Sequence, residues 1–101
     1  MKLIYVPCND EQEAKAISKA LLGEKIIVCS NSFPVNSMLL WDGEIQEKTE
    51  HVVLLKTKDS LADAVQKRVK ELHSYDVPAI IVIDANANQG YLDWLIKSVR
   101  D

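Results

Sequence analysis

The most concentrated polar chemistry in the sequence is the segment His73-Ser74-Tyr75-Asp76, which brings an imidazole, a hydroxyl, a phenol and a carboxylate together. The segment lies between a predicted helix and a predicted apolar strand, and loops held by such elements often carry binding residues. We therefore expect His73, Tyr75 and Asp76 to line a cleft between subunits. A purely structural role is the alternative, in which His73 caps the helix and Tyr75 fills the core.

Soft or borderline metal ligands are few in this chain. They are Cys8, Cys29 and the two histidines His51 and His73, besides two methionines. Thiolate and imidazole groups suit copper and zinc. The two cysteines do not form a C-x-x-C pair, so neither a zinc knuckle nor a redox dithiol is predicted. We expect at most a weak site for copper or another divalent cation, with Cys29, His73 and Cys8 as candidate ligands. For Cys29, the alternative is a small buried apolar residue.

Carboxylates are the second candidate group. Glu44, Glu47 and Glu50 lie in one predicted strand and, with Asp76, could form a pocket for a hard cation or remain a solvated face. No nucleophile elbow, P-loop or zinc-hydrolase motif is present, so we predict neither an enzyme nor an organic cofactor. A catalytic pair of Cys29 with His73 is the alternative, since distant residues can meet in a fold.

Composition excludes several other classes of protein. At 101 residues, the chain is predicted to form one domain over residues 1–101. Its net charge of −3 and scattered basic residues argue against a nucleic-acid partner. No run approaches the roughly 20 apolar residues of a membrane span, and no signal-peptide core is present. We therefore expect a cytoplasmic protein without a membrane partner, whose cysteines remain thiols.

The elements that position these residues begin with a buried strand over Leu3–Val6, which Pro7 is expected to end. Asn9, with Gln12 three residues later, has the pattern of a capping box. The helix that follows carries apolar residues at helical spacing and is predicted to end at Gly23.

A long hairpin is predicted next. Its first strand covers Ile26–Phe33, is interrupted by a bulge at Pro34, and resumes at Ser37–Trp41. Asp42-Gly43 favours a tight type I′ turn. The return strand, Glu44–Lys58, would span about 50 Å if it were straight, whereas a compact chain of this size is roughly 35 Å wide. The hairpin must bend or project, and a projecting ribbon needs a partner chain.

The second half repeats the strand–helix–strand order. Ser60 and Asp63 predict a capped helix that ends near Leu72, and Ala79–Ile83 predicts a strand buried on both faces. A final helix carries apolar residues from Leu92 onwards. This order predicts an α+β, ferredoxin-like split β-α-β sandwich with an antiparallel sheet, a long protruding hairpin and a C-terminal helix.

Several motifs, in order and at matching spacing, resemble those of one family, the CutA divalent-cation tolerance proteins. The matching segments are Cys8-Asn9-Asp10-Glu11, Val28-Cys29-Ser30-Asn31, Trp41 to Glu44, Glu50, Lys56-Thr57, the segment from His73 to Pro78, and Tyr91-Leu92-Asp93-Trp94. Ser74 departs from the family pattern, which has proline there, and Val28 and Ser30 differ from the usual neighbours of the cysteine.

The resemblance implies a cytoplasmic homotrimer whose hairpins embrace their neighbours, and a link to tolerance of copper or other divalent metals. Glu50 and Lys56 match family positions, and we expect them to form a structural or pocket-lining ion pair. The expected cleft residues are Trp41, Glu50, Lys56, His73, Tyr75 and Asp76.

A small-molecule sensor is the alternative function. Trimeric PII signalling proteins share the ferredoxin-like arrangement and bind ligands in clefts between subunits, so fold analogy supports this alternative. Unlike PII proteins, the chain has no long Gly-rich or basic loop to close over a nucleotide.

Overall fold

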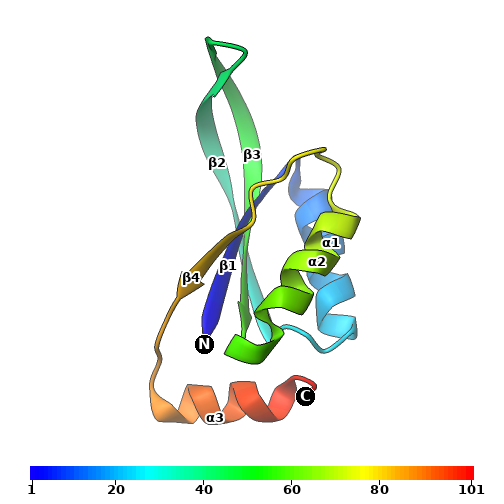
Figure 1. Cartoon of the computed structure of the whole chain (residues 1–101), viewed down its shortest axis with the longest axis vertical. Coiled ribbons are helices and arrows are strands. Elements are labelled where there is room, and N and C mark those ends of the chain that lie inside the picture. Colours follow the sequence, from blue (N-terminus) through cyan, green and yellow to red (C-terminus); the bar gives the residue numbers. More distant parts are fainter.

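The chain folds into a four-stranded sheet with two helices packed against one face and a third helix across its lower end (Figure 1). The computed structural model describes residues 1–101. The elements in chain order are β1 (Lys2–Cys8), α1 (Glu11–Gly23), β2 (Cys29–Trp41), β3 (Glu44–Thr57), a short 3-10 helix η1 (Asp59–Leu61), α2 (Ala62–Leu72), β4 (Ile81–Asp84) and α3 (Gln89–Ser98). The sheet order is β2-β3-β1-β4, with every neighbouring pair antiparallel. The predicted α+β, ferredoxin-like architecture is confirmed.

Pro7 lies inside β1 and does not end it, so that expectation was wrong. The residue is opposite Val52 of β3, while on the other side β4 pairs with β1 only as far as Tyr5. A proline is compatible with this central strand because no neighbouring strand lies beside it on the β4 side.

The hairpin is one uninterrupted ladder. β2 pairs with β3 from Cys29 to Trp41 in a constant register, and Pro34 lies opposite His51 without an inserted residue. The predicted bulge was therefore wrong. β2 is an edge strand, where a residue without an N–H group leaves no ladder bond unmade. The strand also begins three residues later than the predicted Ile26–Phe33 segment.

The turn of the hairpin has the predicted geometry. Asp42 and Gly43 have φ values of 51° and 79°, the positive pair that a type I′ turn requires. The hairpin rises beyond α1 and α2 (Figure 1), and the molecule extends 45 Å along its longest axis but only 24 and 20 Å along the others. The projecting hairpin is confirmed.

The two faces of the sheet differ in what covers them. On one face, the strands pack against α1 and α2 in a core of fully buried residues. That core consists of Ile4, Val6, Cys8, Ala14, Ile17, Leu21, Ile26, Ile27, Val53, Leu55, Ala62, Val65 and Val69. The opposite side, called the open face below, is defined by the residues that share it through the register: Leu3, Tyr5, Phe33, Val35, Val52, Leu54, Ile81 and Ile83.

β4 was predicted to be buried on both faces, which is wrong for the single chain. All four of its residues are exposed, including Ile81, Val82 and Ile83. The strand is at the edge of the sheet, and α3 turns away below it instead of covering it (Figure 1). None of the helices is both long and apolar enough to cross a membrane.

Two helix starts differ from the predicted ones. The N-cap of α1 is Asp10, not Asn9: its Oδ1 accepts a hydrogen bond from the Glu13 N–H at 2.8 Å. The Glu13 carboxylate in turn accepts from the Asn9 N–H at 2.9 Å. α2 starts after η1 and has no side-chain cap, so Ser60 does not have the predicted role.

Candidate functional site

The loop after α2 crosses the free end of β1 and is held there by His73. The backbone N–H of His73 caps α2 by donating to the Val69 carbonyl at 2.9 Å, which confirms the predicted capping role. Its ring makes two further bonds, with Nδ1 3.1 Å from the Tyr75 N–H and Nε2 2.8 Å from the Pro7 carbonyl. Because Nδ1 accepts, we assign the ring proton to Nε2. The imidazole therefore takes the place of a strand neighbour beside Pro7.

Glu13 ties the start of α1 to the same loop. One carboxylate oxygen accepts from the Asn9 N–H and the other from the Ser74 N–H, both at 2.9 Å. Oε1 also lies 3.8 Å from His73 Nδ1. Burial by itself would raise the pKa of Glu13, but the hydrogen bonds from Ser74 and Asn9 outweigh it and lower the pKa. The ionised carboxylate therefore links the start of α1 to the loop after α2.

Cys8, Glu13 and His73 form the only cluster of potential metal ligands, with ligand atoms within 4.8 Å of one another. Cys8 is fully buried, and burial raises its pKa to about 12, so the thiol stays protonated at neutral pH. Both ring nitrogens of His73 and both oxygens of Glu13 are already hydrogen-bonded. The donor types suit a transition metal, but the atoms do not form a ready site.

Cys29 lies elsewhere. It is opposite Lys56 of β3, and Lys56 is opposite Leu3 of β1. Leu3 is four residues from Pro7 along β1, so the level of Cys29 in the sheet is roughly 13 Å from that of Pro7. The structure therefore does not bring Cys29 and His73 together, and the alternative of a catalytic pair was wrong.

Lys56 also lies away from the loop that follows α2. Its ammonium lies 5.8 Å from the Tyr91 ring centroid. Burial and the neighbouring Cys29 raise the pKa of Tyr91, so the phenol stays protonated. The predicted ion pair between Glu50 and Lys56 does not form within the chain.

Glu50 pairs instead with Lys48 and Tyr75. The Tyr75 hydroxyl donates to Glu50 Oε2 at 2.9 Å, and the Lys48 ammonium lies 3.6 Å from the same oxygen. Glu50 is only 7% exposed. Its burial would raise the pKa, but hydrogen bonds from Ser37 and Tyr75 and the charge of Lys48 lower it. The almost fully buried Glu50 carboxylate therefore stays ionised.

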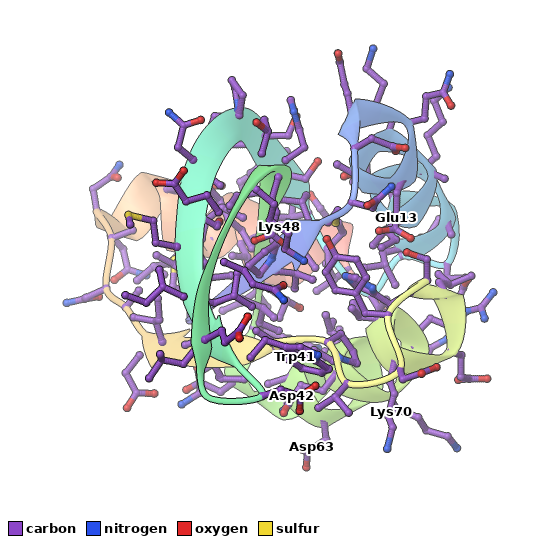
Figure 2. All side chains as sticks on the ribbon, turned by 90° about the horizontal axis from the view of Figure 1, so that it is seen from above. Glu13, Trp41, Asp42, Lys48, Asp63 and Lys70 are labelled. Carbon is purple, nitrogen blue, oxygen red and sulfur yellow. The ribbon has the colours of Figure 1, made fainter.

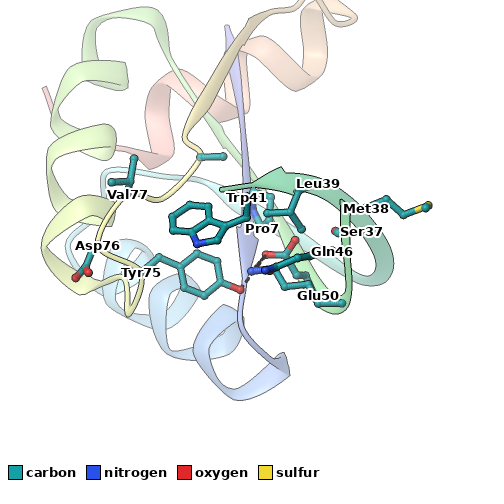
Figure 3. Close-up of a pocket in the computed structure, with 12 residues that line it drawn as sticks. Pro7, Ser37, Met38, Leu39, Trp41, Gln46, Glu50, Tyr75, Asp76 and Val77 are labelled. Atoms are coloured by element: carbon teal, nitrogen blue, oxygen red, sulfur yellow. Dashed lines mark hydrogen bonds and ion pairs between the residues drawn. The ribbon is translucent and has the colours of Figure 1, made fainter. Parts of the chain in front are cut away.

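These residues line a cleft of about 540 Å³ between the hairpin and the loop (Figure 3). Trp41 and Tyr75 point into it, and Glu50 lies beyond the Tyr75 hydroxyl (Figure 3). Viewed from above, the hairpin twists so that its turn at Asp42 lies towards that loop (Figure 2). The full lining is Pro7, Ser37, Met38, Leu39, Trp41, Gln46, Lys48, Glu50, Tyr75, Asp76, Val77 and Ala79.

Of the six residues predicted to line a cleft between subunits, four line this cleft within the single chain, namely Trp41, Glu50, Tyr75 and Asp76. His73 lies behind the cleft and orients Tyr75, while Lys56 is at the other end of β3. The sequence argument missed Lys48. A signal for it was present, because residues two apart in a strand share a face and Lys48 precedes Glu50 by two.

The sequence and the fold were compared with known proteins. The profile of the CutA1 divalent ion tolerance family matches residues 2–98. The divalent-cation tolerance protein CutA of Pyrococcus horikoshii is 40% identical over 101 residues, covering 99% of both chains. That of Thermus thermophilus is 41% identical over 95 residues, covering 92% of this chain and 90% of the relative.

Solved structures of such proteins have the same fold. The crystal structure of Pyrococcus horikoshii CutA1 superposes with a TM-score of 0.96 at 39% identity, over the whole of both chains. The Archaeoglobus fulgidus protein, described as a periplasmic divalent cation tolerance protein, gives 0.95 at 34% identity over 99% of this chain and 100% of the other. Family profile, full-length relatives and fold all agree, and the chain belongs to the CutA1 divalent ion tolerance family.

Proposed function

We propose that this protein acts in divalent-cation tolerance as a homotrimer, with the open face of the sheet as the surface between subunits. The observation that carries the proposal is the apolar character of that face together with the exposure of β4. Ile81 is 49% and Ile83 41% exposed in the single chain. The unpaired edge of an exposed, apolar strand is a surface on which another chain can pair. Trp41 and Ile45 near the hairpin tip, 58% and 71% exposed, add surface that only another chain can bury.

Sedimentation equilibrium tests the assembly. We expect three times the chain mass of 11.4 kDa. Ile83→Asp places a charge on the open face and is expected to release monomers, whereas the matched control Ile96→Asp, on the exposed side of α3, leaves the mass unchanged. Wild-type protein that remains monomeric at micromolar concentration contradicts the proposal.

We further propose that the protein binds copper or another divalent cation weakly, as cargo. The donor types of Cys8 and His73, with Glu13 beside them, suit such an ion. Each ligand atom must first give up a hydrogen bond or a proton, so the affinity is expected to be low.

Calorimetric titration with copper under reducing and non-reducing conditions tests this binding. We expect His73→Ala and Cys8→Ser to weaken it, while Cys29→Ser, whose thiol is distant, serves as the matched control. If only Cys29→Ser weakens binding, the cation is held at the Cys29 end. Equal binding by all variants contradicts both assignments.

We propose binding rather than catalysis. What supports this is the state of the cysteine that lies beside His73: the buried Cys8 has a pKa raised to about 12, and thiols react as thiolates. Iodoacetamide is therefore expected to leave Cys8 unmodified at neutral pH in the folded protein. Rapid alkylation of Cys8 would return the enzyme hypothesis to consideration.

A small-molecule sensor is the second candidate function, and the cleft favours it. Its volume of about 540 Å³ falls within the usual range of ligand pockets, and it combines apolar walls with a few fixed polar groups. Fold analogy with PII proteins suggests a nucleotide, which titration with ATP tests directly. We expect no ATP binding, because the buried charge at this cleft is the carboxylate of Glu50.

We propose a cytoplasmic location, supported by two cysteines that remain free thiols, Cys8 and Cys29. Cell fractionation tests it, and recovery in the periplasm, the location stated for the Archaeoglobus fulgidus relative, contradicts it.

A further inference from the structure

The cleft already holds a positive charge over an aromatic ring. The Lys48 ammonium lies 4.3 Å from the centroid of the Tyr75 ring and 3.6 Å from Glu50 Oε2. An ammonium beside both a ring face and a carboxylate is attracted by each of them. The Lys48 side chain is 42% exposed, so it reaches this position from solvent and can leave it at little cost in packing. The position is therefore a cation site, and another cation can replace the Lys48 ammonium there.

The acceptor at this position is held rigidly. Glu50 is on β3, within the sheet, and the Tyr75 hydroxyl fixes one of its oxygens at 2.9 Å. Tyr75 is itself positioned by its backbone N–H, which donates to His73 Nδ1. Burial and the neighbouring Glu50 carboxylate raise the pKa of Tyr75, so the phenol stays a hydrogen-bond donor. A preorganised acceptor of this kind loses little freedom when a ligand binds.

The remaining lining selects for an organic cation. Lys48, Glu50 and Asp76 are the charged lining residues and sum to −1, with Glu50 the buried member. The other side of the cleft is apolar and includes Trp41 and Val77. An inorganic cation such as Mg²⁺ or Ca²⁺ prefers several oxygen ligands, which these walls do not supply.

We propose that the cleft binds an organic ammonium, a primary amine with an apolar or aromatic body. The ammonium displaces Lys48 between Glu50 and the Tyr75 ring, and the body lies against Trp41. The proposal rests on the sensor candidate above, for which it names the ligand class, and is independent of the copper proposal.

Three probes of similar shape and different charge test the ligand class: phenethylamine, the neutral 2-phenylethanol and the anionic 3-phenylpropionate. Each is titrated into the isotopically labelled full chain, and the shift of the Trp41 indole N–H signal is followed by NMR. We expect phenethylamine to bind on the order of tenfold more tightly than the alcohol, and the acid not to bind. Equal binding by amine and acid overturns the proposal, and so does the absence of amine binding.

Three variants locate the cation. Glu50→Gln removes the charge at constant shape and is expected to weaken amine binding about tenfold. Lys48→Met removes the internal competitor, so amine binding should tighten several-fold. Glu47→Gln, an exposed residue on the other face of the same strand, is the matched control and should have no effect. If Glu50→Gln fails to fold, Lys48→Met still tests the proposal. Unchanged or weaker amine binding in that variant shows that the amine does not displace the Lys48 ammonium.

Sedimentation of the same samples separates this proposal from the assembly. Intact trimer without amine binding refutes only the ligand class. Monomer that binds the amine refutes only the assembly.

Discussion

The helix-covered face and the open face of the sheet are built from the same strands, but they differ in how far the chain itself covers them. In β3, Val53 and Leu55 point into a core that α1 and α2 complete, whereas Val52 and Leu54 point to the open face. Both sets are apolar, because alternate positions of one strand serve two surfaces. The helices of the same chain bury the first set. On the open face, Val52 is buried as well, whereas Ile81 and Ile83 of β4 stay 49% and 41% exposed. Only the apolar residues that stay exposed on the open face are available to the proposed assembly.

The largest effect is expected in the covered core. Leu55→Ala leaves a cavity beside the helices and should lower the free energy of unfolding by about 2–5 kcal/mol, since Leu55 is fully buried. Denaturant unfolding should show the same loss at every protein concentration, because the cavity lies within one chain. A loss that shrinks as the protein is diluted would show that the two faces are not energetically separate.

A smaller effect, of a different kind, is expected at the hairpin tip. Trp41 is 58% exposed in the single chain, so Trp41→Ala should barely change the stability of a monomer. In the assembly we expect a loss of roughly 2 kcal/mol, the scale of an interfacial tryptophan. The melting temperature of the variant should then depend on concentration. Equal destabilisation at all concentrations would show that Trp41 stabilises its own subunit and not the assembly.

The smallest expected effect concerns acid. The pKa of Glu13 in the folded protein is lowered from its ordinary value of 4.5. The stability that this carboxylate contributes is therefore fully present above about pH 4.5 and is lost as the pH falls through the lower folded value. Glu13→Gln should flatten the loss of stability below pH 4.5, measured as denaturant midpoints from pH 7 to pH 3. Glu71→Gln, an exposed carboxylate at the end of α2, is the control and should leave the slope unchanged.

The sequence was sufficient for the architecture because its strongest signals are local. The Asp42-Gly43 turn and the helical spacing in α1 and α2 each depend on residues that are neighbours in the chain. What failed depended on distant partners. Pro7 could stay in β1 only because β4 ends at the level of Tyr5. The apolar run of β4 predicted burial on both faces, but all four residues are exposed in the single chain, because the strand lies at the edge of the sheet.

The site divides in the same way. Tyr75, Asp76 and Trp41, which were predicted to line a cleft between subunits, meet in one cleft of the single chain. Their segments are rich in polar or aromatic groups, which is a local signal. The partner of Glu50 was wrong because the choice between Lys48 and Lys56 depends on how far each lies along β3 from the loop. Only the crossing of that loop over Pro7 fixes this distance, and no local pattern contains it.

The position of β1 in the middle of the sheet has a consequence for how the protein is made. Lys2 pairs with Thr57 on one side and with Asp84 on the other. β1 is synthesised before both of its neighbours and must wait for them, about 80 residues of synthesis in all, or roughly 4–16 s at 5–20 residues per second. During that time its unpaired backbone N–H and C=O groups are open to other nascent chains, and Pro7, which cannot donate to a foreign strand, protects one end.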